Sequence, residues 1–484
     1  MRTLPVQQGH NYTYLAPTLV DTSDLHMPHH HRFRDLYLTQ SAANFLQSKG
    51  DKTVKGIKKL LGMALLGALA FGAYMYFHDT QGPELSFSPD EGYITRSTLL
   101  HLELQDKSGL KQASVILTQG DNEFTLLDKK YPADTTSVHE AIELDPNLQD
   151  GPVEITISTT DRAYYHFGKG NSTDVTYALT RDTRAPMLSV NTRAHNLNYG
   201  GAGLIAYTSS EPLLKSGIRV EERFFPGYEQ PDGSYICLFA FPYDADPDTI
   251  PRLEGTDAAG NTGNGGFYYH LNKRRFITDT IHINDRFLNS KMPQFEHMFP
   301  EAQTPLDIFL KVNRELRPQN RAWLEEVGSN TQPYPTWDQA FIRQPNTATR
   351  ATFGDRRKYI YAGETIDTQT HLGVDLASVA QDQIQASNDG TVVFTDFVGI
   401  YGNCIIIDHG LGLQSLYAHL SSIDVSVGEE IERGDIIGRS GSTGLAGGDH
   451  LHFSMVISGT PVNPIEWWDQ NWVQNNISSK LPPR

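Results

Sequence analysis

The feature that most constrains this 484-residue chain is a long apolar run near its N-terminus. Leu60–Phe77 holds 18 residues without a charge, which as a helix measure about 27 Å, close to the thickness of a bilayer's hydrocarbon core. No good cleavage site of small residues follows the run, which argues against a removed signal peptide. We therefore expect a transmembrane helix over residues 55–78.

Charged residues on the two sides of the run predict its orientation. Acidic residues follow it, at Asp79 and Glu84, and four lysines precede it (Lys52, Lys55, Lys58 and Lys59). Because Lys and Arg concentrate on the cytoplasmic side of membrane helices, residues 1–54 are predicted to form a polar cytoplasmic tail. A histidine-rich stretch in this tail could bind metal loosely, although a solvated tail is the simpler interpretation (His26, His29, His30 and His31).

The composition excludes several classes of protein. Lys and Arg number 40 against 57 Asp and Glu, a net charge of −17, so no basic face for nucleic acid is expected. The chain has two cysteines, Cys237 and Cys404, too few for a disulfide scaffold or a cysteine-ligated structural zinc. With 38% hydrophobic residues it can form real cores, and its length predicts two to four domains.

Two β-rich modules are predicted after the helix, at residues 80–184 and 185–280. Short runs of alternating or β-branched residues separated by turns, such as Leu99–Leu104 and Val153–Ile157, are typical of antiparallel sandwiches. Modules of this kind usually act as spacers or as surfaces for envelope protein partners.

A weak internal repeat relates the two modules. Lys107-Ser-Gly-Leu110 recurs as Lys215-Ser-Gly-Ile218, and Thr160-Asp161 recurs as Thr256-Asp257. The segment Thr256–Asn261 resembles the closing turn of bacterial immunoglobulin-like domains. The repeat agrees with two tandem copies of one fold.

A helical connector is predicted at residues 281–345. Thr304 is a good N-cap residue and Pro305 suits the first helical position. Pro318, which has no backbone N–H, is expected to end this helix. Packing alone is the expected role of the connector.

Three short motifs stand out in the last predicted domain, residues 346–470, which precedes a tail at 471–484. They are His371-Leu-Gly-Val-Asp375, Tyr417-Ala-His419-Leu420 and His450-Leu-His452-Phe453. Each alone is weak, but together, inside a glycine-punctuated β pattern, they indicate a site. A lipoyl-carrier sandwich has similar glycine spacing, yet it gives no reason for the histidines and lacks here an exposed lysine in the expected hairpin turn.

Zinc chemistry explains these residue types. A catalytic zinc takes three His, Asp or Glu ligands and keeps a fourth position for water. In a strand, His450 and His452 fall on one face because side chains alternate with period two. The chain has no His-Glu-x-x-His helix, so a histidine must act as general base. His409 and Asp449 are expected to be structural.

Residues from about 350 to 468, roughly a quarter of the chain, resemble the lysostaphin-type zinc metalloendopeptidases, which cleave peptide bonds in bacterial peptidoglycan. The resemblance rests on the three motifs, the glycine pattern of Gly428–Asp435 and Pro461-Val-Asn-Pro464. It implies one Zn²⁺ held by His371, Asp375 and His452, with His419 and His450 as the catalytic histidines. Which of those two is the general base stays open.

The chain is thus predicted to be mainly β and multidomain: a transmembrane helix, two immunoglobulin-like β-sandwich modules, a short helical connector and a C-terminal antiparallel β metallopeptidase domain. The resemblance and the anchor imply a single-pass inner-membrane protein whose periplasmic domain cuts peptidoglycan peptide stems, at D-alanyl–diaminopimelate bonds in a Gram-negative envelope. Two alternatives stay open: a non-catalytic scaffold or amidase regulator that binds through the same groove, and a peptidase acting on other secreted substrates. Residues 346–370 are the segment expected to be able to cover the groove.

Overall fold

The structure is a computed structural model that describes residues 41–481, with side chains from residue 56 onward. It is mainly β, with 42% strand and 19% helix in several separate sheets, which confirms the predicted mainly β, multidomain class. The chain divides into two compact units, with the boundary between His78 and Asp79. The predictions for the histidine-rich stretch at residues 26–31 lie outside the described residues.

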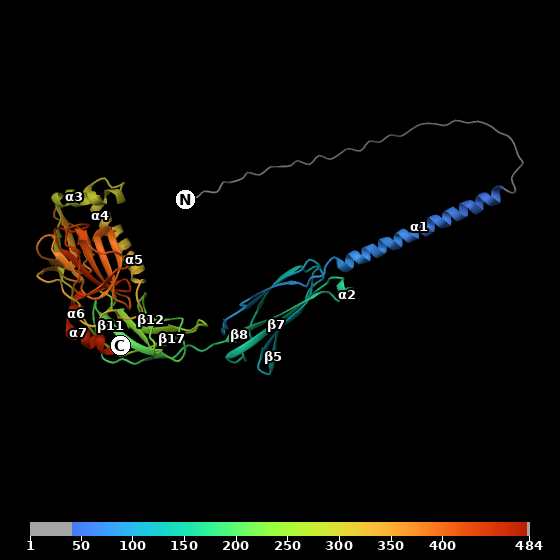
Figure 1. The fold of residues 1–484 in the computed structure, drawn as a ribbon, viewed down its shortest axis with the longest axis horizontal. Coiled ribbons are helices and arrows are strands. Elements are labelled where there is room, and N and C mark those ends of the chain that lie inside the picture. The colour runs from blue at the N-terminus through green and yellow to red at the C-terminus, as the bar shows by residue number, and fades with distance from the viewer. Residues whose placement is uncertain (1–40, 482–484) are drawn as a thin grey trace, which may run out of the picture. The chain divides into compact units, whose positions relative to one another are not determined.

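The first unit contains one long helix, α1 (Ser41–Phe77), drawn in blue in Figure 1. It begins earlier than the predicted residue 55. Its stretch Gly56–Phe77 has a mean hydropathy of 1.8, and no part of that window is buried inside the protein. An apolar helix that no described part of the chain covers suggests a single-pass membrane anchor.

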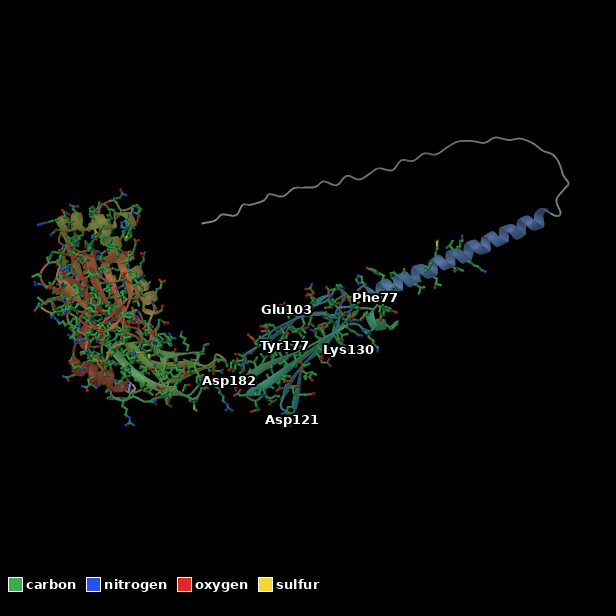
Figure 2. All side chains as sticks on the ribbon, viewed as in Figure 1. Phe77, Glu103, Asp121, Lys130, Tyr177 and Asp182 are labelled. Atoms are coloured by element: carbon green, nitrogen blue, oxygen red, sulfur yellow. The ribbon has the colours of Figure 1, made fainter. Side chains whose placement is uncertain are left out.

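The first β module consists of two sheets around its own core. In β3 (Leu100–Gln105), leucines at every second position are buried and the residues between them are exposed, as the alternating pattern predicts. The sheet order is β1-β3-β6 in one sheet and β2-β8-β7-β4-β5 in the other. Figure 2 shows the side chains of this module, including Glu103 on β3 and Tyr177 on β8. The other bounds are β1 (Glu84–Ser88), β2 (Tyr93–Ile94), β4 (Leu110–Gln119), β5 (Asn122–Lys130), β6 (Ser137–Ile142), β7 (Gly151–Asp161), α2 (Tyr165–Gly168) and β8 (Ser172–Arg181).

The second β-rich region also has two main sheets, here of four strands each, in the orders β14-β15-β11-β9 and β13-β12-β16-β17, and a parallel pair of β10 with β18. Its strands are β9 (Leu188–Val190), β10 (His195–Asn198), β11 (Ala202–Ser209), β12 (Lys215–Val220), β13 (Arg223–Pro226), β14 (Tyr228–Glu229), β15 (Tyr235–Ala240), β16 (Arg252–Thr256), β17 (Thr262–Gly265) and β18 (Tyr269–Asn272). That either module is immunoglobulin-like, and where the domains begin and end, stay predictions.

The predicted repeat corresponds to an Asp–Asn contact that both modules form, although it closes a loop over ten residues in the first module and a turn over four in the second. Asp161 accepts hydrogen bonds from the backbone and side-chain nitrogens of Asn171, both at 2.7 Å. Asp257 accepts the same pair from Asn261, at 2.9 and 3.0 Å. Each asparagine side chain also donates to a backbone oxygen just before the predicted start of its module (Asp79 at 3.3 Å and Asp182 at 3.2 Å).

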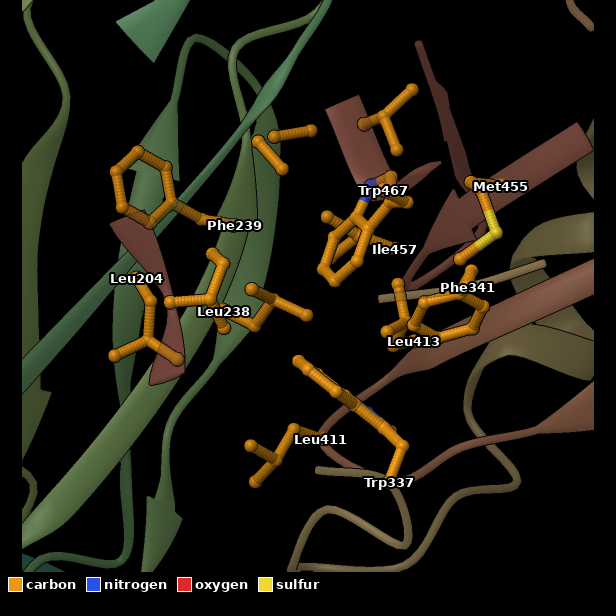
Figure 3. Close-up of a cluster of buried hydrophobic side chains, with 14 of the residues drawn as sticks. Leu204, Leu238, Phe239, Trp337, Phe341, Leu411, Leu413, Met455, Ile457 and Trp467 are labelled. Carbon is orange, nitrogen blue, oxygen red and sulfur yellow. The ribbon is translucent and has the colours of Figure 1, made fainter. Parts of the chain in front are cut away.

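The second β-rich region and the C-terminal domain share one hydrophobic core. Figure 3 shows Leu238 on β15 facing Trp467 and Ile457, which belong to the C-terminal domain. All three side chains are at most 1% exposed. Polar contacts join the same two regions, because the Glu466 carboxylate accepts hydrogen bonds from Asn198 Nδ2 at 2.6 Å and from Ala202 N at 3.0 Å.

The connector consists of two runs of helical segments, one from Asp285 to Met298 and one from Pro305 to Gly328. At Thr304 a capping box forms: its hydroxyl accepts from Asp307 N at 3.1 Å, and the Asp307 carboxylate accepts from Thr304 N at 3.0 Å. The segments are α3 (Asp285–Lys291), the 3₁₀ helix η1 (Met292–Met298), α4 (Pro305–Lys311), the π-helical turn η2 (Val312–Leu316) and α5 (Arg317–Gly328).

The prediction that Pro318 ends this helix is wrong. Pro318 lies at the start of α5, and the helix continues through the π turn η2 before it. In that turn the Arg317 N–H bonds to the carbonyl of Val312, five residues back. The wider turn accommodates the proline ring and its missing donor, which a regular α-helix could not do without a kink.

The C-terminal domain is built on a large antiparallel sheet in the order β20-β23-β31-β27-β26-β25-β29, with β32 added beside β31. Two three-stranded sheets accompany it, β24-β30-β28 and β19-β21-β22. The segment expected to cover the groove, residues 346–370, forms β20, β21 and β22. The bounds are β19 (Thr278–His282), β20 (Ala348–Ala351), β21 (Arg356–Tyr361), β22 (Glu364–Thr370), β23 (Val374–Ala377), β24 (Gln383–Gln385), β25 (Gly390–Val398), η3 (Gly399–Tyr401), β26 (Gly402–Asp408), β27 (Leu413–Leu420), β28 (Ser422–Ile423), β29 (Glu430–Ile431), β30 (Ile436–Arg439), β31 (Leu451–Ile457), β32 (Thr460–Val462), α6 (Pro464–Trp468), α7 (Gln470–Asn476) and η4 (Ser478–Lys480).

Candidate metal centre

Three of the five predicted site residues converge on one point. His371 Nε2 lies 2.9 Å from Asp375 Oδ1 and 3.0 Å from His452 Nδ1, and the last two atoms are 2.9 Å apart. Ligands about 2.0 Å from a tetrahedral ion would lie about 3.3 Å from one another. The donor set and its spacing therefore fit a divalent metal ion.

Strand pairing brings these side chains together. Asp375 on β23 lies directly opposite His452 on β31, and His371 lies in the turn between β22 and β23. Gly373 makes this approach possible, because a Cβ there would lie 2.6 Å from His452 Nε2 and 2.5 Å from Ser454 Oγ.

Hydrogen bonds on the outer side of each ring fix which nitrogen carries the proton. His371 Nδ1 lies 3.0 Å from the carbonyl oxygen of Thr352, which can only accept, so this nitrogen is the donor. His452 Nε2 lies 3.0 Å from Ser454 Oγ, whose own hydroxyl donates to Leu372 O at 2.8 Å. Both rings therefore direct a lone pair toward Asp375 Oδ1, as metal ligands require.

The Asp375 carboxylate is held from its other side by an arginine. Arg357 Nη2 donates to Asp375 Oδ2 at 2.8 Å, which leaves Oδ1 toward the two histidines. Burial alone would raise the pKa of Asp375, but His371, His450 and His452, in their protonated forms, hold this pKa well below its usual range. Arg357 was not predicted from sequence, because nothing in its neighbourhood on β21 distinguishes it from a surface arginine.

The two remaining predicted residues, His419 and His450, lie beside this set. Their ring centroids are 4.9 Å apart, and that of His419 is 5.7 Å from that of His452. The Nδ1 atoms of both rings face carbonyl oxygens at 2.8 Å, so each Nδ1 is a donor and each Nε2 keeps a lone pair (Thr443 O for His419, Gly448 O for His450). Both rings can therefore take up a proton at Nε2.

A β-bulge directs His419 to the site. The pairing of β26 with β27 shifts register between Asn403 and Ile405, and His419 has a φ of 65°. Its neighbour Ala418 lies opposite His452. In a regular strand His419 would point to the other face, so the bulge lets it join the face of the site. The sequence shows no signal for this bulge.

Different surroundings separate the pKa values of the histidines. Burial, with the neighbouring His450 and His452, lowers the pKa of His419 well below its usual value. Burial acts in the same direction on His450, but Asp375, whose Oδ1 lies 3.5 Å from His450 Nε2, raises the pKa of His450 overall. Burial lowers the pKa of His452 to about 4.

All five residues line one cavity of about 430 Å³. Its other walls include β19, the connector and β21, so segments far from the histidine motifs in sequence help to complete it. His409, predicted to be structural, lies elsewhere: its nitrogens lie 2.6 Å from Asp389 O and 2.8 Å from Ser415 Oγ. Asp449 accepts hydrogen bonds from Ser440 and Gln381 and is not among the cavity residues.

Comparison with known proteins identifies the family of this domain. Residues 369–464 match the model of peptidase family M23. The C-terminal part of the chain therefore contains a peptidase M23 domain, which confirms the family predicted from the histidine motifs.

Individual relatives share this segment. Over 95 residues the chain is 42% identical to the DD-carboxypeptidase/endopeptidase Mpg of Neisseria meningitidis serogroup B, and over 96 residues 40% identical to the peptidoglycan DD-endopeptidase ShyA of Vibrio cholerae. Each match covers 20% of this chain and 22% of the relative, about a fifth of its length. The solved catalytic domain of lysostaphin from Staphylococcus simulans is 28% identical, with 25% of this chain and 92% of that chain covered at a TM-score of 0.22.

Proposed function

We propose that this protein is a membrane-anchored zinc metalloendopeptidase that hydrolyses peptide cross-links of bacterial peptidoglycan. The observation that carries the proposal is the convergence of His371 Nε2, Asp375 Oδ1 and His452 Nδ1 within 3.0 Å, inside an M23 domain. The relatives named as peptidoglycan endopeptidases support the substrate class.

These three residues would hold the ion, and no other described part of the cavity offers a comparable donor set. A zinc ion bound there supplies a Lewis acid that polarises the scissile carbonyl and lowers the pKa of a bound water. Arg357 keeps Asp375 oriented, and Thr352 and Ser454 keep the two histidine ligands in the required tautomers.

Proton transfer falls to His419 and His450. Each keeps a lone pair on Nε2 because its Nδ1 donates to a backbone carbonyl. One ring accepts the proton of the attacking water and later passes it to the leaving amine. The other ring, when protonated, donates a hydrogen bond to the oxyanion that forms on the carbonyl oxygen.

The single apolar helix supports a place at the cell envelope. With lysines before it and acidic residues after it, the helix would leave the N-terminus in the cytoplasm and the M23 domain in the periplasm, at the inner membrane. The β-rich regions would space the domain from the bilayer or bind envelope proteins. The bond we propose is the D-alanyl–diaminopimelate cross-link.

The alternative is a non-catalytic scaffold or amidase regulator that uses the same cavity for binding. A binding groove has no need for three metal-directed donor atoms and two further histidines with free Nε2 atoms, and this chain has all five. The geometry therefore favours hydrolysis.

The test measures zinc content and release of peptides from purified peptidoglycan by the full chain in detergent. His371→Ala and Asp375→Ala should lose both zinc and turnover. His419→Ala and His450→Ala should keep zinc and lose most of the rate, by about 10²–10⁴-fold. His297→Ala, at an exposed position on η1, is the matched control and should change neither. Full hydrolysis by the His450→Ala protein would refute its role.

A further inference from the structure

The charged residues that line the site are mostly positive, opposite in sign to the net charge of the protein. The chain as a whole has a net charge of −17. Apart from histidines, the charged residues that line the main cavity and a smaller adjoining one are three arginines and one aspartate (Arg317, Arg321, Arg357 and Asp375). Charges that line a cavity with low-dielectric walls dominate the potential within it, whatever the distant surface carries. The site is therefore suited to an anionic ligand.

Two of these arginines are not neutralised by the protein. Arg357 forms an ion pair with Asp375. Among the residues whose side chains the structure describes, no carboxylate lies within 4.0 Å of the guanidinium of Arg317 or Arg321. Both line the smaller cavity together with His371 and His452. Unpaired cations thus lie beside two of the candidate metal ligands.

Arg317 is held in place rather than free in solvent. Its Nε donates to Asn313 Oδ1 at 2.7 Å, and Asn313, in the π turn η2, is 1% exposed. The backbone oxygen of Asn313 in turn accepts from Gln369 Nε2 on β22 at 3.1 Å. A side chain fixed in this way loses little entropy on binding a ligand.

We propose that Arg317, supported by Arg321, binds a carboxylate of the substrate next to the scissile peptide bond. The proposal rests on the proposed function and specifies its substrate as a peptide with a free carboxyl group at that place. A guanidinium presents planar donors that match a carboxylate. The neighbouring apolar side chains of Leu372 and Ile400 exclude water and strengthen the contact.

The test compares two cross-linked tetrapeptide dimers that differ only at the α-carboxyl group beside the scissile D-alanyl bond, free in one and a carboxamide in the other. With the zinc-loaded full chain in detergent, kcat/KM should fall about 10- to 100-fold on the amide. Arg317→Gln should show the same loss on the free acid and no further loss on the amide, and Arg317→Lys should lose less. Arg314→Gln is the matched control, because Arg314 is an exposed arginine on the same helical run as Arg317 and forms an ion pair with Asp367 on β22. It should discriminate between acid and amide as the wild type does.

Calorimetric binding of the diaminopimelate-containing leaving peptide, as free acid and as amide, gives a readout independent of turnover. The subsite is supported if the wild type binds the acid more tightly than the amide and Arg317→Gln removes this preference without changing the zinc content. If neither dimer is hydrolysed but this preference is found, only the proposed hydrolase activity is wrong. Equal hydrolysis and equal binding of acid and amide overturn the subsite and leave the hydrolase intact. Equal losses by Arg317→Gln on both dimers, or loss of its zinc, overturn it in favour of a structural role.

Discussion

The two β-rich regions form the same Asp–Asn contact but differ in what their cores contact. In the first module, Leu102, Val115 and Ile155 belong to a cluster made only of residues from that module, among the side chains described. In the second, Leu204 and Leu238 belong to a cluster that continues into the M23 domain. Sequence similarity between the copies therefore does not make them equivalent: one has a core of its own, and the other shares its core with the M23 domain.

This difference predicts two cooperative units in the region after the helix. Regions that share a buried core unfold together, whereas a module with its own core can unfold alone. We call the second β-rich region and the M23 domain together the shared body. Four predictions test the comparison, from the largest effect to the smallest.

Trp467→Ala should destabilise the shared body by about 3–5 kcal/mol, because it removes a fully buried indole from the common cluster. Scanning calorimetry of the full chain should show one transition moving to lower temperature while that of the first module stays in place. Phe167→Ala, at a position 83% exposed, is the control. Separate transitions for the second β-rich region and the M23 domain would contradict the shared core.

Ile155→Ala should destabilise the first module by about 2–5 kcal/mol through the cavity it leaves in that module's own core. The transition of the shared body, the zinc content and the hydrolysis of soluble cross-linked peptides should not change. A parallel loss of zinc or turnover would show that the first module is needed to maintain the site.

The shared body should lose stability in acid because of His409. Burial lowers the pKa of His409 to about 4 from an ordinary value of about 6.5. The unfolded chain therefore takes up this proton at a higher pH than the folded one, and stability falls by up to about 3 kcal/mol as the pH drops from 6.5 to 4. His409→Gln should be less stable at pH 7 but show a flatter pH dependence in denaturant titrations. An unchanged slope would exclude His409 as the source.

The first module should show the opposite trend, although a smaller one. Burial raises the pKa of Asp106 to about 6, and the nearby Asp161 and Asp79 act in the same direction. Because the folded module holds this proton more tightly than the unfolded chain, its stability falls as the pH rises from 4 to 6, by about 1 kcal/mol. Asp106→Asn should remove this slope in the module's own transition. A slope that persists in the variant must come from other groups.

Local patterns made much of the architecture predictable. The period-two leucines of β3, the N-cap at Thr304 and the common face of His450 and His452 depend on residues a few positions apart, and the structure has all three. The three histidine motifs identified the family for the same reason, since each motif is short and contiguous.

Features that depend on distant contacts were not predictable. The placement of Asp375 opposite His452 depends on which strands pair, and the orientation of His419 depends on a bulge set by its neighbouring strand. Arg357 and Arg317 reach the cavity from β21 and the connector, and no local pattern marks them. The continuation of the helix past Pro318 required a π turn, which sequence periodicity does not reveal.

The left-handed backbone at His419 has a consequence for the evolution and engineering of this chain. A non-glycine residue at a φ of 65° costs about 1–2 kcal/mol, whereas glycine adopts that conformation freely. Selection for this backbone conformation alone would therefore favour glycine at position 419 and discard the proposed proton acceptor. Robustness and reactivity make opposing demands at this single residue.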